Sequence, residues 1–424
     1  MRRDKYDLVV IGAGPAGMIA AIEYAQTGGS VLVLEKNNIV GKKLSITGKG
    51  RCNITNDAGF NEFVKHFGKK GRFLKYSLSE FSNRDLLDYF RKKGIKFKLE
   101  RGGRYFPISD KSEDIVNTLA DEMHKHRVKL HTGSKAVEIS FDKELYRIKT
   151  EKNTYLSEKL IIATGGKSYP GTGSSGDGYK FASDLGHTVE KPVPSLVPIK
   201  IKGDIPLKLN GLSLKNVSIE VWTDNGKKAQ EFGEMLFTRD GLSGPAALTL
   251  SPEIVSLYNK KQSLKVFIDM KPGLDHKKLD NRLLREINAR GKQKFKNLLK
   301  DLLPKKIIPV VLELTGIPEE RLLNKITSKE RKKLRLILKG IEFEVAGFGS
   351  FSQAIVTSGG VSVKEINPVT MESRITPGLY FAGEVIDIDA DTGGYNLQAA
   401  FSTGMTAARG CIKADKEGRE NNEA

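Results

Sequence analysis

Six residues near the N-terminus have the types and spacing that bind a dinucleotide. They read Gly12-Ala13-Gly14-Pro15-Ala16-Gly17, the pattern G-x-G-x-x-G. In this pattern the first glycine allows a sharp turn, the second lets the backbone approach a pyrophosphate, and the third lets a helix pack closely on a strand. The phosphates then lie at the helix N-terminus. Glu35 follows roughly 20 residues later, where an acid accepts hydrogen bonds from ribose hydroxyls, and its charge argues against the 2′-phosphate of NADP.

A second run of the same pattern, Gly171-Thr172-Gly173-Ser174-Ser175-Gly176, lacks the context of a dinucleotide site. It follows Ser168-Tyr169-Pro170 instead of the end of an apolar strand, and no later strand ends in an acid at the required distance. We therefore interpret it as a loop that leads into a helix over 177–185. No separate NAD(P) domain is then expected.

Two further glycine-rich segments follow apolar strands. The run 160–162 continues into Ala163-Thr164-Gly165-Gly166, whose small residues would let the backbone lie close to a cofactor. An ordinary parallel strand with a glycine turn is the alternative. The strand 379–382 continues into Gly383-Glu384, and Gly394-Tyr395-Asn396-Leu397 then opens a helix. That helix N-terminus would stabilise negative charge at N1 and O2 of a reduced flavin. The alternatives are a cap on the pyrophosphate and a plain surface helix.

The elements that must position these glycines read as β-α-β at the start of the chain. A strand over 6–11, a helix over 18–26 and a strand over 30–34 predict the beginning of a parallel sheet. Prolines near residue 190 mark a change in the sequence pattern and a crossing between domains. After them, residues 195–270 alternate between apolar and polar, as residues of antiparallel strands do. Residues 275–339 have a helical, lysine-rich pattern, and the last stretch regains a strand followed by a glycine-rich helix start.

An insertion into one domain explains this order. We expect an α/β fold with a discontinuous Rossmann-type nucleotide-binding domain of residues 1–193 and 361–424. An inserted β-rich domain would span 194–272 and 341–360, and it would carry a helical subdomain of residues 273–340. The length of 424 residues suits two or three domains.

Composition excludes several classes of protein. Two cysteines and six scattered histidines provide neither a disulfide framework nor a metal cluster, and the absence of C-x-x-C excludes a dithiol relay within the chain. No apolar stretch reaches the ~20 residues of a membrane span, and the basic start leads into a strand and not a signal h-region, so we expect a cytoplasmic protein without a membrane partner.

The charge leaves a choice open. The formal net charge of +19 could attract nucleic acid, anionic lipid or acidic substrates, or it could reflect a lysine-rich solvated surface. No basic motif interleaved with aromatic residues appears, which argues against a nucleic-acid partner without excluding one.

The glycine motifs at both ends, taken with longer runs, resemble a known family. The runs are 41–56 (G-K-K-L-S-I-T-G-K-G-R-C-N-I-T-N), 233–238 (G-E-M-L-F-T), 241–246 (G-L-S-G-P-A) and 366–389. They are similar to the YhiN/BaiN-type family of NAD(P)/FAD-dependent oxidoreductases, also called aminoacetone-oxidase-like, within the glutathione-reductase-like FAD superfamily. The resemblance covers nearly the whole chain. It implies a discontinuous FAD domain, a β-rich insertion and a helical subdomain. The segment 163–178 is more distantly similar to fumarate-reductase and aspartate-oxidase flavoproteins.

By that resemblance, non-covalent FAD would lie along the loop 41–56, with Lys43, Arg51 and Asn53 donating to phosphate or flavin oxygens. A surface ion pair is the alternative for Arg51. Cys52 is expected to be a small buried residue, with a covalent flavin link or a redox thiol as alternatives. The full set of expected cofactor-binding residues is Gly12, Gly14, Pro15, Ala16, Gly17, Glu35, Lys36, Lys43, Gly48, Arg51, Cys52, Asn53, Val137, Ala163, Thr164, Gly165, Gly383, Glu384, Gly394, Tyr395, Asn396 and Leu397.

These observations predict a flavin-dependent oxidoreductase that transfers a hydride to or from a small organic substrate. The flavin would be recycled by NAD(P)H that docks transiently, or by O2. The alternatives are a basic flavoprotein that modifies RNA and a redox sensor without catalytic turnover. The residues assign no catalytic acid or base, no metal, no reaction direction and no oligomeric state.

Overall fold

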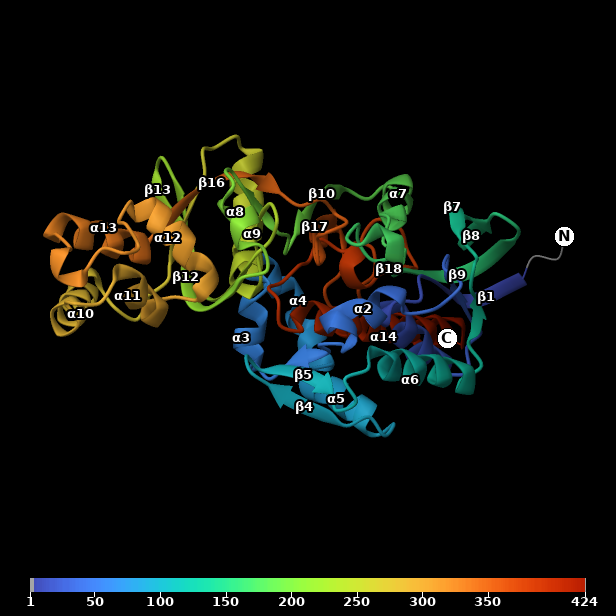
Figure 1. Ribbon diagram of the computed structural model, residues 1–424. Helices are drawn as coiled ribbons and strands as arrows, with labels where there is room; N and C mark the ends of the chain where they lie inside the picture. The colour runs from blue at the N-terminus through green and yellow to red at the C-terminus, as the bar shows by residue number, and fades with distance from the viewer. Residues whose placement is uncertain (1–3, 424) are drawn as a thin grey trace. The chain divides into compact units, whose positions relative to one another are not determined.

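The computed structural model describes residues 4–423, and side chains as far as Glu417. The chain forms two compact units, one of Met1–Pro194 with Ala354–Ala424 and one of Ser195–Gln353 (Figure 1). The first unit is built from both ends of the chain. The second unit is the intervening segment, and each unit has its own hydrophobic core.

A seven-stranded sheet forms the centre of the first unit, in the order β6-β2-β1-β9-β8-β7 with β18 also paired to β9. Strand β1 (Asp4–Ile11) lies parallel to both β2 (Val31–Leu34) and β9 (Thr154–Ile162). Near the other end of the chain, β18 (Leu379–Phe381) pairs parallel to β9, with Leu379 opposite Leu160. The inner strands are continuous buried apolar runs, as expected for strands that are covered on both faces. The remaining strands of this sheet are β6 (Lys129–His131), β7 (Ala136–Asp142) and β8 (Leu145–Thr150).

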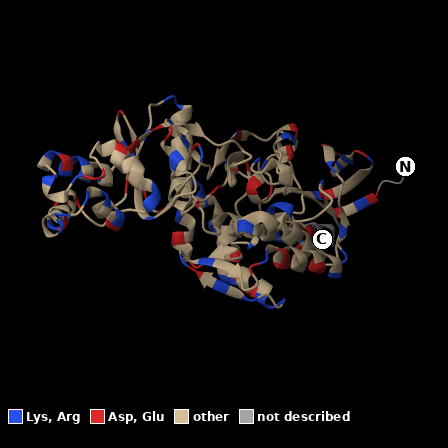
Figure 2. Cartoon of the chain, viewed as in Figure 1, with Lys and Arg blue, Asp and Glu red and all other residues tan. Residues whose placement is uncertain are grey.

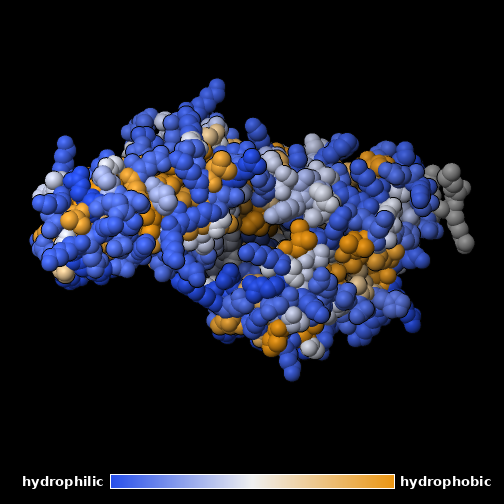
Figure 3. Space-filling model, viewed as in Figure 1, coloured by the Kyte–Doolittle hydropathy of each residue, from blue (hydrophilic) through white to orange (hydrophobic). Residues whose placement is uncertain are grey.

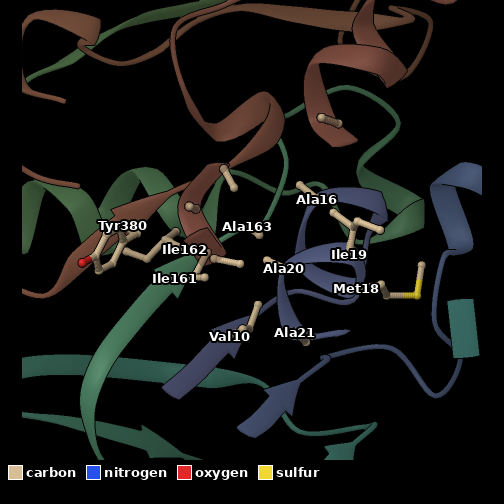
Figure 4. Packing of buried hydrophobic residues seen from close by; sticks show 14 of the residues in the cluster. Val10, Ala16, Met18, Ile19, Ala20, Ala21, Ile161, Ile162, Ala163 and Tyr380 are labelled. Carbon is tan, nitrogen blue, oxygen red and sulfur yellow. The ribbon is translucent and has the colours of Figure 1, made fainter. Parts of the chain in front are cut away.

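Two helices from opposite ends of the chain pack together against this sheet. They are α1 (Pro15–Ala25) and α14 (Tyr395–Glu423), and a Cβ at Gly404 of α14 would lie 2.3 Å from the carbonyl oxygen of Ala16. Figure 4 shows side chains of α1 and of the strands β1 and β9 in one buried cluster. Gly404 of α14 therefore allows the first and last segments of the chain to form one layered core.

In the sequence, most other elements of the first unit come between β2 and β6, and others follow β9. Its helices are α2 (Lys42–Gly50), α3 (Phe60–Lys65), α4 (Gly71–Glu80), α5 (Asn83–Arg91), α6 (Ser112–Lys125) and α7 (Asp177–Asp184). Its short strands are β3 (Thr55–Asn56), β4 (Phe97–Glu100), β5 (Arg104–Pro107), β10 (Val189–Ser195) and β17 (Val356–Val361). Strands β3, β5 and β4 form an antiparallel sheet, and β10 pairs with β17.

The second unit is a closed barrel with attached helices. Its strands, in the order β11-β14-β13-β12-β15-β16, are β11 (Ile199–Ile201), β14 (Gly241–Ser243), β13 (Gly226–Phe237), β12 (Ser213–Thr223), β15 (Lys265–Asp269) and β16 (Ile341–Phe348). Its helices are α8 (Ile205–Leu209), α9 (Pro245–Asn259), α10 (His276–Ala289), α11 (Phe295–Leu302), α12 (Ile308–Thr315) and α13 (Ser328–Lys339). Barrel residues such as Ile219 and helix residues such as Leu283 share one core. The α/β class with a parallel sheet and a separate antiparallel β domain is confirmed.

The second boundary between the units differs from the expected one. Residues 354–360 belong to the first unit and not to the insertion. The reason is the pairing of β17 with β10, which holds this segment against residues 189–195. A Cβ at Gly359 would lie 2.5 Å from the Lys191 carbonyl oxygen, so the segment is tightly packed there. No helix among residues 4–423 is long and apolar enough to cross a membrane.

Candidate functional site

The three glycines of the first motif have different surroundings. A Cβ at Gly12, which has φ +104°, would lie 2.5 Å from the carbonyl oxygen of Ala163. A Cβ at Gly17 would lie 2.0 Å from the carbonyl oxygen of Gly12. No atom lies within 4 Å of a Cβ built at Gly14. The outer glycines are therefore required by packing within the protein, whereas the middle one borders open space.

The start of α1 presents unpaired N–H groups to that open space. Gly14 is the N-cap, no side chain caps the helix, and the first backbone bond runs from Met18 N–H to Gly14 O at 2.9 Å. The N–H groups of Ala16 and Gly17 thus have no acceptor earlier in the helix. These donors and the positive end of the helix dipole suit a phosphate.

The Glu35 carboxylate lies beside the same loop and is 7% exposed. Its Oε2 accepts from Ala13 N–H at 2.9 Å, and its Oε1 accepts from the backbone N–H and side-chain amide of Asn37 at 2.8 and 2.7 Å. A carboxylate has about four lone-pair sites, so these three bonds orient it and leave capacity for a further donor. The residues present therefore fit the phosphate and ribose groups of a dinucleotide.

The second glycine run packs against residues that follow β2. Lys36 Nζ lies 2.7 Å from Asp177 Oδ2, and a Cβ at Gly173 would lie 2.4 Å from the side-chain nitrogen of Asn37. Gly176, with φ +84°, precedes α7. The run is thus a loop that leads into a helix, as predicted from its context.

A polar cluster joins four separate segments of the first unit. Lys43 Nζ lies 2.6 Å from both Glu384 Oε2 and Ser168 Oγ. Glu384 Oε1 accepts from Ser168 Oγ and from Thr357 N–H, each at 2.8 Å. The structure therefore brings two predicted site residues together, but it pairs the Lys43 charge with a carboxylate of the protein.

Two other predicted residues of the loop 41–56, Arg51 and Asn53, differ in whether their side chains have protein partners. Arg51 contacts Glu100 at 2.9 Å and Asp110 at 3.4 Å, and its guanidinium lies over the Phe106 ring. These contacts match the ion-pair alternative for Arg51, and they involve only its Nη1; a contact of Arg51 with a phosphate stays a prediction. Asn53 has a buried side-chain oxygen without a protein partner among the described residues, which suits a ligand donor.

Gly48 and Cys52 of this loop are constrained by packing within the protein. Gly48 has φ +57°, and a Cβ there would lie 2.9 Å from the Asn53 nitrogen. Cys52 is fully buried, and burial raises the pKa of its thiol to about 12. A thiol that stays protonated is a poor nucleophile, which favours the structural role expected for Cys52.

The start of α14 is fixed by a close backbone contact. A Cβ at Gly394, with φ +100°, would lie 2.5 Å from the carbonyl oxygen of Thr55. Packing against β3 therefore requires a glycine at this position, and the role of Gly394 toward a cofactor stays a prediction. Asn396 bonds back to the preceding loop, accepting from Ala390 N–H at 2.9 Å and donating to Ala390 O at 2.8 Å. Tyr395 and Leu397 flank it in the first turn of α14.

The other expected residues lie along the sheet. Ala163 donates its N–H to Ile11 O at 2.9 Å, which places the segment 163–165 beside the glycine loop. A Cβ at Gly178 of α7 would lie 2.1 Å from Thr164 Oγ1. Gly383 packs against Ala16, since a Cβ at Gly383 would lie 3.0 Å from the Ala16 Cβ. Val137, by contrast, is 37% exposed on β7, the last strand in the sheet order.

One group of residues near α14 was not predicted from the sequence. His66 Nδ1 lies 2.8 Å from Asp391 Oδ2, and the His66 ring stacks on Tyr395 with 3.9 Å between ring centres. Burial raises the pKa of the Tyr395 hydroxyl to about 12, so this ring stays neutral. Asp391 can orient the imidazole of His66, and the imidazole can transfer a proton. No sequence pattern links residues 325 positions apart.

No group of three or more His, Cys, Asp or Glu residues among the described ones could hold a metal ion.

Comparison with known proteins places the chain in a family. Residues 6–410 match the model of the HI0933-like protein Rossmann domain. The chain is 30% identical over 402 residues to a 3-dehydro-bile acid delta(4,6)-reductase of Clostridium scindens, covering 94% of this chain and 97% of that protein. It is 33% identical over 411 residues to a ribosomal RNA dihydrouridine synthase of Escherichia coli, covering 97% and 99%.

Solved structures agree on the fold. An open flavocytochrome c3 fumarate reductase superposes with a TM-score of 0.51 at 15% identity, over 97% of this chain and 78% of that one. At this identity the likeness concerns the fold alone. The family matches confirm the resemblance drawn from the motifs, and the donors around Gly14 and Glu35 fit the cofactor. The chain belongs to the HI0933-like Rossmann family, and it is an FAD-dependent oxidoreductase.

Proposed function

We propose that this protein reduces a carbon–carbon double bond conjugated to a carbonyl, and that its substrate is a uracil base in RNA. The two relatives described above support the reaction class, because a delta(4,6)-reductase and a dihydrouridine synthase both add hydrogen across a ring double bond. The observation that favours RNA is the distribution of charge. Residues 276–339 contain 19 Lys and Arg against 7 Asp and Glu, whereas the rest of the chain contains 51 against 44.

The chain's own residues would divide the work of holding FAD. The unpaired N–H groups of Ala16 and Gly17 would bind the diphosphate, and Glu35 would accept from the ribose. The N-terminus of α14 would face the ring end of the cofactor. Bound FAD, reduced by NAD(P)H that docks transiently, would supply the hydride for one carbon of the double bond.

The second carbon of the double bond needs a proton. His66 is the candidate donor, because its Nδ1 contacts Asp391 at 2.8 Å, so that its Nε2 would serve the substrate. A carboxylate on one ring nitrogen fixes the orientation of the imidazole and leaves the other nitrogen to exchange a proton with the substrate. Asp391 acts on this ring as a positioning residue.

A small unsaturated carbonyl compound is the second candidate substrate. The name of the Clostridium scindens relative favours it. The reaction class is the same, so the two candidates differ only in the molecule that carries the double bond.

The experiment is an anaerobic one. The holoprotein is reduced with NADPH or NADH and then mixed with ribosomal RNA transcribed without modifications, or with a 3-oxo steroid that carries a conjugated double bond. Flavin absorbance reports reoxidation, and mass spectrometry of digested RNA reports the gain of two hydrogens on uridine. Reoxidation by RNA with formation of dihydrouridine supports the proposal. Reoxidation by the steroid alone replaces RNA with the small molecule. If neither acceptor reoxidises the flavin and a final addition of O2 does, the reaction class is overturned.

A further inference from the structure

The positive charge of the second unit is concentrated in its helical part. The segment from α10 to α13 carries a net charge of +12 by residue count, out of +19 for the whole chain. Figure 2 shows Lys and Arg spread over the helices labelled α10, α11 and α13 in Figure 1. A surface charged only for solubility would mix both signs, as the remainder of the chain does.

Much of this charge is not neutralised by neighbouring carboxylates. Lys277, Arg285, Lys329, Lys332 and Lys333 are all exposed. Among the side chains that the structure describes, no carboxylate forms an ion pair with any of these five, although many other basic residues of the second unit have one. These five cations are therefore available to an anionic partner.

The exposed faces of α10 and α13 adjoin each other. Asp280 lies at the edge of the buried stripe of α10, and it contacts Arg331 at 3.2 Å and Arg335 at 3.6 Å on α13. Lys277 and Arg285 lie on the outer side of α10, three residues before and five after Asp280. Lys332 follows Arg331 directly on α13. Exposed basic residues of both helices, Lys277 and Arg285 on α10 and Lys332 on α13, therefore flank this bridge.

Polar groups accompany the charges on α10. A hollow of about 660 Å³, open to solvent, is lined by Asn281, Leu284, Arg285, Asn288 and Ala289. Its amides and guanidinium can donate to phosphate oxygens, ribose hydroxyls and base edges. We infer that the outer face of α10 and α13 is the surface on which the RNA substrate docks, which rests on the proposed function.

A membrane surface fits this face less well. Helices that bind lipid bury an apolar face in the bilayer. Here the apolar stripes are in the protein core, since Leu279 and Leu283 of α10 and Leu334 and Leu338 of α13 are buried. In the view of Figure 3 the surface over these helices is mostly hydrophilic, with small separate apolar spots.

The test removes four charges from this face and compares a matched control. The test variant carries Lys277→Gln, Arg285→Gln, Lys332→Gln and Lys333→Gln in the full-length holoprotein. The control carries Lys75→Gln, Lys92→Gln, Lys129→Gln and Lys152→Gln, four exposed lysines of the first unit. Affinity for a fluorescent ribosomal RNA fragment is measured by anisotropy at several salt concentrations. FAD content and flavin reduction by NAD(P)H are measured on the same samples.

We expect the test variant to bind RNA at least about tenfold more weakly. The magnitude of the slope of log K against log salt should fall by roughly 0.7 to 0.9 for each phosphate that the variant no longer neutralises. The control should change the affinity by less than about threefold. Equal decreases in both variants, or an unchanged affinity of the test variant, overturn the inference. So does binding to phosphatidylglycerol vesicles in place of RNA.

The proposed function fails separately from this inference. If the wild-type protein forms no dihydrouridine and binds no RNA, the substrate is wrong. If it forms dihydrouridine and the test variant still binds RNA as the wild type does, the substrate stands and only the docking surface is wrong.

Discussion

The open space at Gly14 leads to a prediction that separates cofactor binding from folding. Gly14 has φ −84° and ψ −177°, an extended conformation that alanine adopts without strain. An added Cβ would meet no atom within 4 Å. The Gly14→Ala protein should therefore fold as the wild type does. Alanine is a poorer N-cap than glycine but lowers the entropy of the unfolded chain, and these effects of less than about 1 kcal/mol oppose each other.

The same methyl group should block the diphosphate of FAD. It would stand between the phosphate and the N–H groups of Ala16 and Gly17. A hydrogen bond to a charged group contributes about 1.5–3 kcal/mol, so losing two at the lower value costs about 3 kcal/mol. That is roughly a 100-fold increase in the Kd for FAD.

The assay compares apoproteins and holoproteins. Kd is measured by quenching of flavin fluorescence, and the Tm of the apoprotein by circular dichroism. The matched control is Gly17→Ala, whose Cβ would lie 2.0 Å from the Gly12 carbonyl oxygen and should lower the Tm of the apoprotein itself. If Gly14→Ala binds FAD within about threefold of the wild type, the open space is not where the diphosphate approaches.

Four further predictions concern single side chains. Glu35→Gln replaces one accepting oxygen by a donor, and we expect it to weaken FAD binding by about 1–3 kcal/mol, measured as the FAD-to-protein ratio after dialysis. His66→Gln should slow reduction of the double bond by at least about 100-fold, measured by single-turnover flavin reoxidation, because general acids contribute that much. Cys52, whose thiol pKa is raised to about 12, should resist iodoacetamide in the folded protein, and FAD should leave the precipitated protein on acid denaturation. Burial lowers the pKa of His187 below its usual 6.5 in the folded protein. Between the lowered pKa and 6.5 the unfolded chain therefore binds more protons than the folded protein does. The free energy of unfolding should therefore fall as the pH drops below 6.5, and the fall should be smaller in His187→Gln, measured by urea denaturation.

Each of these has a result that would contradict it. Full FAD retention by Glu35→Gln would place the ribose elsewhere. For His66→Gln, the rate of flavin reduction by NAD(P)H should stay at the wild-type value, and His124→Gln on the exposed side of α6 is the matched control. Flavin that stays on the precipitated protein would indicate a covalent link. An identical pH dependence with and without His187 would mean that the buried imidazole does not titrate in this range.

Local sequence determined the nucleotide-binding part of the fold. The motif 12–17, the flanking apolar strands and Glu35 lie within about 30 residues of one another, and the hydrogen bond from Ala13 N–H to Glu35 closes inside that segment. Backbone turns and strand pairing over such a short distance depend on residue types that the sequence displays directly. The same reasoning identified the run 171–176 as a loop, because the missing strand was visible in the sequence.

Tertiary structure decided what the individual side chains meet. The sequence left Arg51 open between a phosphate contact and an ion pair, and its partners Glu100 and Asp110, 49 and 59 positions away, appear only in the structure. Gly394 is required by Thr55, and His66 meets Asp391, because the central sheet brings the two ends of the chain together. Contacts over hundreds of positions depend on how strands order themselves in space, and no local pattern carries that information.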